Sequence, residues 1–368
     1  MTVPISPELS TLVDRVRAAH ADRTPLEVRG GGTKAFYGET PSGRVLDTRA
    51  HTGIVSYQPT ELVVTVASGT RLAELEATLA EKGQGLAFEP PVFGPEATVG
   101  GMLAAGLSGP ARASMGAVRD HVLGATLLDG SGELLQFGGE VMKNVAGYDV
   151  SRVLAGSLGT LGVVIDVSLK VLPLAPATAT VRFAMDEATA LARLNEWGGR
   201  PLPLNASAWW DGTLLLRLRG AMAAVRAAIA LFKDAGGEVL EAGAGAPFWD
   251  GLRHQTDEFF AKALLAVDRG VPLWRVSVPQ TAAPLGFSGE QLIEWHGGQR
   301  WWCTATPPAQ VRRAAAAAGG HATLFRAKDK SPGVFTPLSP GLAAIHRRMK
   351  QSFDPAGIFN PGRLYPDL

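Results

Sequence analysis

The sequence predicts an α+β protein of two domains, and three observations lead to this expectation. The chain has 368 residues, which is more than one hydrophobic core usually serves. Glycine clusters lie mostly before residue 165, whereas all eight tryptophans lie from Trp197 to Trp302. Helix-like and strand-like segments alternate in both halves, and the strands of the second half are typical of an antiparallel sheet backed by helices.

The first half alternates helices and strands from its start. Ser6 followed by Pro7 is typical of a helix N-terminus, and Thr70 is expected to cap a second helix that ends before Gly83. The turn sequence 129–132 (Asp-Gly-Ser-Gly) separates two apolar segments and predicts a hairpin. The expected helices are 7–20 and 72–79, and the expected strands are 26–29, 61–67, 121–128, 133–137 and 162–172.

The second half is expected to form a separate antiparallel layer. A proline-punctuated stretch, 172–177, marks the boundary, so residues 1–175 are expected to form the first domain and 176–330 the second. The expected strands are 180–185, 206–210, 213–218, 273–278, 301–304 and 321–324, and the expected helices are 186–197, 221–235, 248–264, 308–318 and one that begins at Pro340.

Composition excludes several classes of protein. Hydrophobic residues make up 46% of the chain and the mean hydropathy is +0.10, which excludes a disordered chain. The 35 basic and 34 acidic residues leave a net charge of +1, without a general attraction to nucleic acid or anionic lipid. Cys303 is the only cysteine, which excludes a disulfide framework, a cysteine-only zinc site and a cysteine-ligated iron–sulfur cluster in this chain.

The N-terminal residues and the lengths of the apolar runs indicate in which cellular compartment the protein is expected. The start, MTVPISPELS, has neither the basic nor the apolar region of a signal peptide. No apolar run approaches the roughly 18 residues of a membrane-spanning helix. We therefore expect a cytoplasmic protein.

A triple-glycine loop at 29–34, Arg29-Gly30-Gly31-Gly32-Thr33-Lys34, directly follows the expected strand 26–29. Because glycine has no Cβ, three in succession let backbone N–H groups converge on one anion. The loop matches neither the GxGxxG pattern of dinucleotide-binding domains nor a Walker A loop. The alternative is an ordinary glycine-rich turn.

A second glycine pair lies in the segment 95–102, Pro95-Glu96-Ala97-Thr98-Val99-Gly100-Gly101-Met102. The hydroxyl residue Thr98 precedes the glycines, and a run of small and apolar residues, 103–106, follows them. This order predicts a second backbone anion site at the start of a helix. The alternative is a helix start that is simply tightly packed.

Three further segments complete the set. Ser108-Gly109-Pro110-Ala111-Arg112 and the following 116–124, with Asp120, combine small residues and charges at the start of a strand, which suits the lining of a flat ring or a solvated loop. The segment 156–164 leads into an apolar strand, where loop backbone can meet a ligand. The tail 354–363 has two proline turns, which stiffen either a binding segment or a C-terminal clamp without a ligand.

In this order and at these separations, the five motifs resemble the FAD-binding domain of the vanillyl-alcohol oxidase / p-cresol methylhydroxylase (PCMH) flavoprotein family. The resemblance covers about residues 1–175 and the tail after about 330. The segment from Met142-Lys143-Asn144 to Val164 is similar to the glycolate oxidase and D-lactate dehydrogenase branch. Its Gly156-Ser157-Leu158-Gly159, with Leu158 where the catalytic D subunits typically have an acid, resembles the E subunits of bacterial glycolate oxidases.

The resemblance implies a fold and a cofactor. The fold is a two-subdomain PCMH-type FAD-binding domain with an α+β cap of antiparallel sheet plus helices, and a C-terminal segment, 331–368, that returns to the FAD domain. Noncovalent FAD is implied, because Thr33 and Lys34 stand in the first loops where covalent members usually place His or Cys.

The resemblance also assigns residues to FAD. Residues 29–34 and 95–101 would hold the pyrophosphate, 108–116 would lie along the isoalloxazine and ribityl, and 159–164 would meet the adenine side. Asn360 would approach the ring. The cofactor-binding residues implied are Arg29, Gly30, Gly31, Gly32, Thr33, Lys34, Pro95, Thr98, Val99, Gly100, Gly101, Ser108, Gly109, Arg112, Gly116, Asp120, Gly159, Thr160, Gly162, Val163, Val164 and Asn360.

The function implied is that of the FAD-binding subunit of a complex that oxidises glycolate to glyoxylate. The implied partners are a catalytic flavin subunit and an iron–sulfur subunit, through which the chain would lie at the inner membrane. The substrate at the level of the complex is a small 2-hydroxy acid. Two other hypotheses stand: an assembly subunit with a non-catalytic flavin fold, and a self-sufficient FAD-dependent 2-hydroxy acid dehydrogenase.

No catalytic residue and no metal ligand is assigned. The His-x-Gly-Asp-Gly-Asn motif that the catalytic branch typically carries in its cap is absent, and the nearest string is 295–300, Trp-His-Gly-Gly-Gln-Arg. Arg275 and Arg300 have the chemistry to bind a carboxylate, but solvated or structurally paired arginines are the alternative. Packed or surface histidines are expected at His254, His296 and His321, and a catalytic base, at His296 first, is the alternative.

Overall fold

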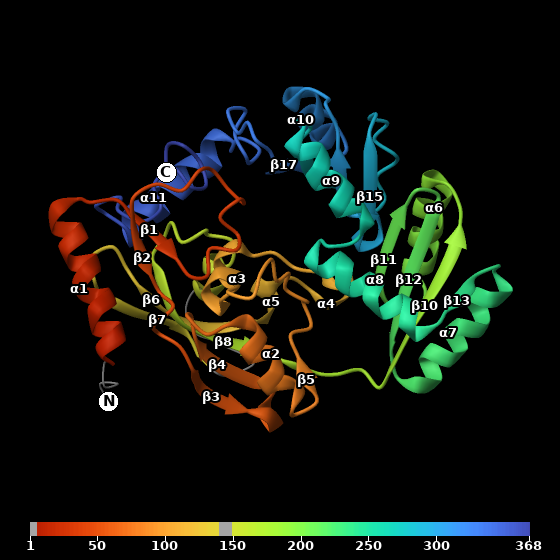
Figure 1. The fold of residues 1–368 in the computed structure, drawn as a ribbon, viewed down its shortest axis with the longest axis horizontal. Helices are drawn as coiled ribbons and strands as arrows, with labels where there is room; N and C mark the ends of the chain where they lie inside the picture. The colour runs from red at the N-terminus through yellow and green to blue at the C-terminus, as the bar shows by residue number, and fades with distance from the viewer. Residues whose placement is uncertain (1–5, 140–148) are drawn as a thin grey trace. The chain divides into compact units, whose positions relative to one another are not determined.

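A computed structural model describes residues 6–139 and 149–368 of the chain (Figure 1). The first part of the segment that carries the resemblance to the glycolate oxidase branch, residues 142–148, lies outside the described residues, whereas its remainder, 149–164, is described. The chain divides into two compact units. The first comprises Met1–Leu107, Ala117–Pro173 and Pro337–Leu368, and the second comprises Ser108–Gly116 and Leu174–Thr336.

The first unit is built on a five-stranded antiparallel sheet in the order β3-β4-β8-β6-β7. Its strands are β3 (Ile54–Gln58), β4 (Val63–Ala67), β6 (Val122–Leu128), β7 (Leu134–Gly138) and β8 (Val163–Lys170). The helices α2 (Leu72–Ala80) and α3 (Val99–Ala105) bury Leu75 and Leu103 against strand residues such as Val167. The expected hairpin is confirmed as β6 and β7, and a short helix, α5 (Val118–His121), leads into it.

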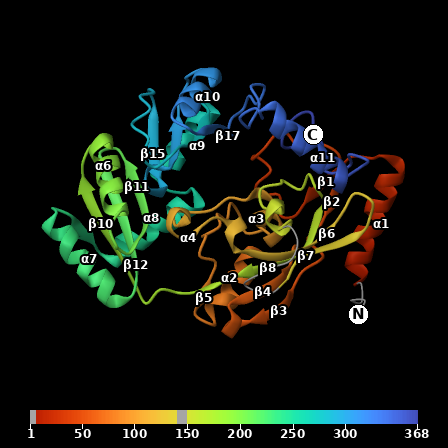
Figure 2. The same cartoon turned by 180° about the vertical axis from the view of Figure 1, so that it is seen from behind.

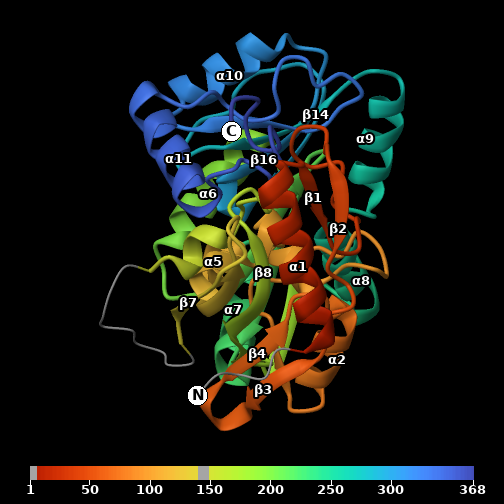
Figure 3. The ribbon, with the colours of Figure 1, turned by 90° about the vertical axis from the view of Figure 1, so that its left-hand side faces the viewer.

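A parallel pair, β1 (Leu26–Arg29) and β2 (Arg44–Asp47), lies beside α1 (Pro7–Asp22) in the same unit (Figure 3). The side chain of Ser6 accepts a hydrogen bond from the Leu9 N–H, so the expected N-cap is confirmed. Val16 of α1 packs with Leu26 and Leu46 in a second core cluster. This packing fixes β1, and the triple-glycine loop begins at its end.

The C-terminal tail runs alongside β1. Helix α11 (Pro340–Phe353) is followed by a segment in which the Ile358 carbonyl accepts from the Leu26 N–H at 2.7 Å. The Asn360 N–H donates to the Leu26 carbonyl at 2.9 Å. Ile358 and Phe359 of this tail are therefore buried with Leu26 of β1 in one cluster.

The second unit contains an eight-stranded antiparallel sheet in the order β13-β10-β12-β11-β15-β16-β14-β17 (Figure 2). Together with the first unit it confirms the α+β class. The strands are β10 (Ala177–Ala184), β11 (Leu204–Trp210), β12 (Thr213–Gly220), β13 (Glu238–Leu240), β14 (Leu273–Ser277), β15 (Glu290–Glu294), β16 (Gln299–Cys303) and β17 (His321–Arg326). The helices are α6 (Glu187–Gly198), α7 (Met222–Asp234), α8 (Ala242–His254), α9 (Glu258–Asp268) and α10 (Pro308–Ala317).

The segment 108–116, which includes α4 (Arg112–Met115), groups with the second unit, although the order of the motifs had placed it in the first. The Ser114 hydroxyl donates to the Asn205 carbonyl at 2.6 Å. The Trp295 indole N–H donates to the Gly109 carbonyl at 3.0 Å. These contacts join residues that are far apart in sequence, so the composition of the segment could not predict them.

Two local predictions are wrong, and one strand was missed. Thr70 does not cap α2, because its hydroxyl is used by the backbone of Gly53, as acceptor at 2.9 Å and as donor at 3.2 Å. The single helix expected over 248–264 is two helices, since Gln255 has a φ of 56° and Asp257 caps a new start. The strand β15 was not expected at all.

Within the described residues, none of the helices combines the length and the apolar character needed to cross a membrane.

Candidate functional site

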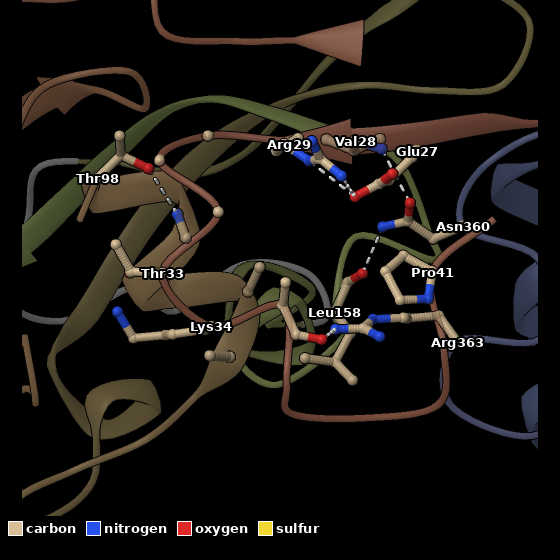
Figure 4. A pocket seen from close by; sticks show the side chains of 17 residues that line it. Glu27, Val28, Arg29, Thr33, Lys34, Pro41, Thr98, Leu158, Asn360 and Arg363 are labelled. Carbon is tan, nitrogen blue, oxygen red and sulfur yellow. Dashed lines mark hydrogen bonds and ion pairs between the residues drawn. The ribbon is translucent and has the colours of Figure 1, made fainter. Parts of the chain in front are cut away.

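A cavity of about 100 Å³ lies in the first unit where the triple-glycine loop, α3 and the C-terminal tail meet (Figure 4). Segments from widely separated parts of the sequence supply its walls, so only the tertiary structure assembles it. The lining residues are Glu27, Val28, Arg29, Gly30, Gly31, Gly32, Thr33, Lys34, Ala35, Pro41, Thr98, Gly101, Ala104, Ala105, Leu158, Asn360 and Arg363.

The triple-glycine loop presents backbone donors to this cavity. Within the described residues, the N–H groups of Gly31, Gly32 and Thr33 donate no hydrogen bond to the protein. Three successive N–H groups without an acceptor in the described part of the protein, in residues that line the cavity, are available to phosphate oxygens. Gly32 has a φ of 68°, a backbone conformation that glycine adopts at little cost.

The glycines are also required by contact between the two glycine loops. A Cβ on Gly30 would lie 2.3 Å from the Thr98 hydroxyl oxygen, and one on Gly31 would lie 1.5 Å from the Glu96 carbonyl oxygen. Thr98 in turn caps α3, accepting from the Gly101 N–H at 3.2 Å. The two loops therefore touch directly, and a side chain at Gly30 or Gly31 would push them apart.

Of the charged side chains that line the cavity, Glu27 and Arg29 neutralise each other, whereas Lys34 has no acidic partner among the described residues. Glu27 and Arg29 form a salt bridge of 2.6 Å with each other. Lys34 makes no ion pair within the described part of the chain, and its ammonium lies 5.6 Å from the centroid of the Phe93 ring. Burial lowers the pKa of Lys34 to about 8. An anion in the cavity would therefore meet one cation that no carboxylate compensates.

The third cation of the cavity, Arg363, organises a loop. Its guanidinium donates to the carbonyls of Ala35 at 2.9 Å, Tyr37 at 2.5 Å and Glu39. Burial lowers the pKa of Arg363, although Glu27 and Glu39 oppose that effect. The C-terminal tail thus holds the loop that follows the triple glycine.

Asn360 joins two other walls of the cavity. Its side-chain oxygen accepts from the Val28 N–H at 2.8 Å, and its amide nitrogen donates to the Leu158 carbonyl at 2.6 Å. A Cβ on Gly159 would lie 2.7 Å from that amide nitrogen, which explains the glycine there. Asn360 itself has a φ of 39°, a region that Asn tolerates better than most residues.

A buried ion pair fastens the tail to the same loop. The Lys350 ammonium donates to Asp354 at 2.7 Å, to the Thr160 carbonyl at 2.8 Å and to the Phe359 carbonyl at 2.7 Å. Asp354 also accepts from the N–H groups of Ile358 and Phe359. Every donor of the ammonium has an acceptor, as a buried Lys requires.

These features fit the diphosphate of FAD. Free N–H donors, an uncompensated Lys and a carboxylate that is already paired favour a group with two negative phosphates. The described residues that line the cavity include no His or Cys. We find no group of three or more His, Cys, Asp or Glu side chains placed to hold a metal ion in the described ranges.

The cavity brings together nine of the residues assigned from the resemblance: Arg29, Gly30, Gly31, Gly32, Thr33, Lys34, Thr98, Gly101 and Asn360. Others do not line it. Gly100 packs against Ser68, Val163 and Val164 belong to β8, and the carbonyl of Thr160 accepts from Lys350. The assigned residues outside the lining are Pro95, Val99, Gly100, Asp120, Gly159, Thr160, Gly162, Val163 and Val164 in the first unit and Ser108, Gly109, Arg112 and Gly116 in the second.

Eight lining residues were not assigned from the sequence. Leu158 and Arg363 lie inside motifs that the sequence singled out, and Ala104 and Ala105 lie in the run of small residues after Gly101. Their positions next to those motifs were the available signal. No pattern points to Glu27, Val28, Ala35 or Pro41, which line the cavity only because β1 and the loop after it fold around it.

The candidate polar residues of the second unit have differing surroundings. Arg300 is fully buried and donates to the carbonyls of Ala282, Ala283 and Gly297, which is a structural role. The N–H of His296 donates to the Ser207 hydroxyl, and burial lowers the pKa of its imidazole. On α8, His254 lies 3.4 Å from Asp250.

Comparison with known proteins agrees with this geometry. Residues 8–138 match a family described as FAD binding domain, and residues 328–364 match FAD linked oxidases, C-terminal domain. The chain is 45% identical to glycolate oxidase subunit GlcE of Escherichia coli (strain K12) over 359 residues, which is 97% of each chain.

Two more distant relatives share parts of the chain or its fold. Glycolate oxidase subunit GlcD of Bacillus subtilis (strain 168) is 30% identical over 187 residues, 50% of this chain and 39% of that one. A solved structure of alkyldihydroxyacetonephosphate synthase covers 97% of this chain and 75% of its own, with a TM-score of 0.63 at 16% identity. That likeness concerns the fold alone.

Proposed function

The chain belongs to the FAD-linked oxidase family, and we propose that it is the FAD-binding subunit of a glycolate oxidase complex. The observation that carries the proposal is the 45% identity to GlcE over 97% of both chains. A match that spans both units, and not only the FAD-binding domain, favours the same role for the whole chain.

FAD is the cofactor of this family, and when bound it accepts a hydride and passes electrons on. The chain's own residues bind and orient it. We assign the diphosphate to the N–H groups of Gly31, Gly32 and Thr33 and to the Lys34 ammonium. Asn360 fixes the distance between β1 and the loop at Leu158, and so the width of the site.

The attachment is proposed to be noncovalent. Covalent flavin needs a nucleophilic side chain such as His or Cys at the ring. Thr33 and Lys34 stand in the first glycine loop, where covalent members of the family usually place His or Cys, and Cys303, the chain's single cysteine, lies on β16. Burial raises the pKa of the Cys303 thiol, with Glu290 adding to the effect, so this thiol is a poor nucleophile at neutral pH.

Partner subunits follow from the likeness to GlcE, whose name marks it as one subunit of an oxidase. We propose a catalytic flavin subunit and an iron–sulfur subunit as those partners. A single cysteine cannot ligate an iron–sulfur cluster, so a cysteine-ligated cluster of the complex must be held by another chain. The missing His-x-Gly-Asp-Gly-Asn motif supports assigning the removal of the substrate proton to a partner.

The test is reconstitution of the complex. The full chain carrying an affinity tag is expressed with and without a D-type flavin subunit and an iron–sulfur subunit, and glycolate-dependent reduction of a dye is measured. We expect the three chains to copurify and to reduce the dye, and the tagged chain alone to do so slowly or not at all. Brisk turnover by the lone chain would identify it as a self-sufficient dehydrogenase, and failure to copurify would contradict the subunit role.

A further inference from the structure

The second unit carries a cluster of cationic and donor side chains that the cofactor site does not use. Ser277 of β14 is directly opposite Gln299 of β16 and His321 of β17, and Arg275 lies two residues before Ser277. Because side chains alternate along a strand and paired residues share a face, all four lie on the same face of the sheet.

Gln299 is a fully buried member of this cluster with a missing partner. Its side-chain oxygen accepts from the Arg275 guanidinium Nε at 2.9 Å, whereas its amide Nε2 has no acceptor within the described residues. A buried donor without a partner is costly, and native structures rarely retain one without a reason. The amide nitrogen therefore marks a place for an acceptor atom that the protein itself does not supply.

Two guanidinium groups act on this face of the sheet. Arg275 forms no ion pair within the described part of the chain. Burial lowers the pKa of His321, and the charges of Arg275 and Arg112 lower it further. Arg112 comes from α4, so two guanidinium groups from distant parts of the sequence act on one imidazole. Such a group of cations favours a bound anion.

The Trp295 ring provides the platform for both guanidinium groups. Their Cζ atoms lie 4.5 Å (Arg112) and 5.3 Å (Arg275) from its centroid, and its indole N–H is held by the Gly109 carbonyl. Trp295 has a φ of 54° and the following His296 one of 57°. Two successive bulky residues in the left-handed region are strained, and such strain is typical of functional sites.

A carboxylate is present on the same sheet face, and it is already engaged. Glu294 of β15 lies opposite Gln299, is buried, and accepts a hydrogen bond from the Trp301 indole N–H at 2.5 Å. It therefore does not supply the acceptor that Gln299 Nε2 lacks, since that atom remains without a partner.

We propose that Arg275, Gln299 and Arg112 form a binding site for the carboxylate of a small acid. A carboxylate has two oxygens in one plane, which matches the fork of a guanidinium and leaves lone pairs for an amide N–H. The choice of acid rests on the proposed function, which makes glycolate the first ligand to test. This chain would therefore bind a 2-hydroxy acid although it lacks the His-x-Gly-Asp-Gly-Asn motif.

The test is calorimetric titration of the FAD-loaded full chain with glycolate, with ethylene glycol and with inorganic phosphate. We expect glycolate to bind, ethylene glycol not to bind because it has no carboxylate, and phosphate to bind more weakly than glycolate. Equal affinity for phosphate would overturn the carboxylate assignment. Absence of glycolate binding by the folded chain would overturn the site altogether.

Variants locate the binding. Arg275→Met and Gln299→Leu are expected to weaken glycolate binding by about tenfold or more, and Arg275→Lys by less, because the charge remains. The control is Arg182→Met, whose guanidinium is exposed and pairs with Glu238 on β10 and β13. Thermal unfolding establishes that each variant folds. Arg112→Gln, at a half-buried position, gives an independent variant if the Arg275 change impairs folding.

The outcomes separate this proposal from the proposed function. Unchanged glycolate affinity in Arg275→Met and Arg112→Gln would overturn the site, even if the complex oxidises glycolate. Conversely, glycolate binding that these variants abolish would support the site even if the chain did not assemble with the other subunits.

Discussion

Asn360 and Leu158, which are 202 positions apart in sequence, are joined by a hydrogen bond of 2.6 Å from the Asn360 side-chain amide to the Leu158 carbonyl. The same side chain accepts from the Val28 N–H. One residue of the C-terminal tail therefore sets the spacing between β1 and the loop at Leu158, the two walls of the proposed FAD site.

We expect Asn360→Ala to weaken FAD binding by roughly tenfold or more, because two buried backbone groups lose their partner at about 1–3 kcal/mol each. Titration of the apoprotein with FAD, followed by flavin fluorescence, measures the effect. Asn195→Ala, which removes a side-chain bond to the Leu191 carbonyl on α6, is the matched control. An unchanged FAD affinity in Asn360→Ala would show that the tail does not shape the site.

Substitution of Gly31 tests the contact between the two glycine loops. Gly31→Ala is expected to abolish or strongly reduce FAD binding, because the new Cβ would overlap the Glu96 carbonyl and displace the 95–101 loop. The effect therefore acts through the second loop and not through direct overlap with phosphate. Gly198→Ala, where a Cβ meets nothing within 4 Å, should bind FAD normally. Normal FAD content in Gly31→Ala would contradict the loop contact.

Lys34 makes FAD binding depend on pH. Its pKa of about 8 lies below the ordinary 10.5, so the ammonium loses its proton as the pH rises through about 8. A bound diphosphate favours the charged form, and FAD affinity should therefore be highest below pH 8 and fall between pH 8 and 9.5. Lys34→Met should bind FAD more weakly at pH 7 and lose this pH dependence, whereas Lys34→Arg should retain affinity at pH 9. Parallel pH profiles for wild type and Lys34→Met would refute the role.

The same shift has a consequence for stability without FAD. Between pH 8 and 10.5 the unfolded chain binds more protons at Lys34 than the folded chain does, so this residue makes folding more favourable as the pH rises through that range. Lys34→Met should remove that increment from the pH dependence of unfolding by urea.

Lys350 and Lys262 each form an ion pair with a carboxylate four residues away, Asp354 and Glu258, and the two ion pairs differ in burial. Lys350 is buried and bonded to Asp354 and two carbonyls, whereas Lys262 is exposed beside Glu258. Lys350→Met leaves Asp354 buried without its cation and should cost about 3–5 kcal/mol of unfolding free energy. Lys262→Met should cost less than about 1 kcal/mol. Equal melting temperatures for the two variants would contradict the role of Lys350.

The sequence predicted the fold class and most elements because periodicity and capping residues are local signals. Ser6 caps its helix as predicted, and Asp186, expected as the first residue of a helix, caps one, since each bonds within its own first turn. Thr70 looked equivalent, but a contact with Gly53 competes for its hydroxyl. The break at Gln255 depends on a left-handed backbone conformation, and because the residue there is not glycine, no local signal in the sequence predicts it.

The site was predictable where its residues are consecutive. The loop 29–34 lines the cavity as a block, and Asn360 was assigned to the site from the family resemblance of the tail. Arg363 donates to the Ala35 carbonyl, and Lys350 donates to the Thr160 carbonyl. Both contacts join residues far apart in sequence, so a single sequence does not predict them. The same holds for segment 108–116, whose partners Asn205 and Trp295 lie far along the chain.

The most direct test of the account is the visible spectrum of the purified full chain after equilibration with FAD and removal of free flavin, followed by acid precipitation. The account predicts flavin absorption in proportion to protein, and yellow colour that moves into the supernatant on precipitation. A colourless protein would contradict the assignment of the cavity to FAD, and colour retained in the pellet would contradict noncovalent binding.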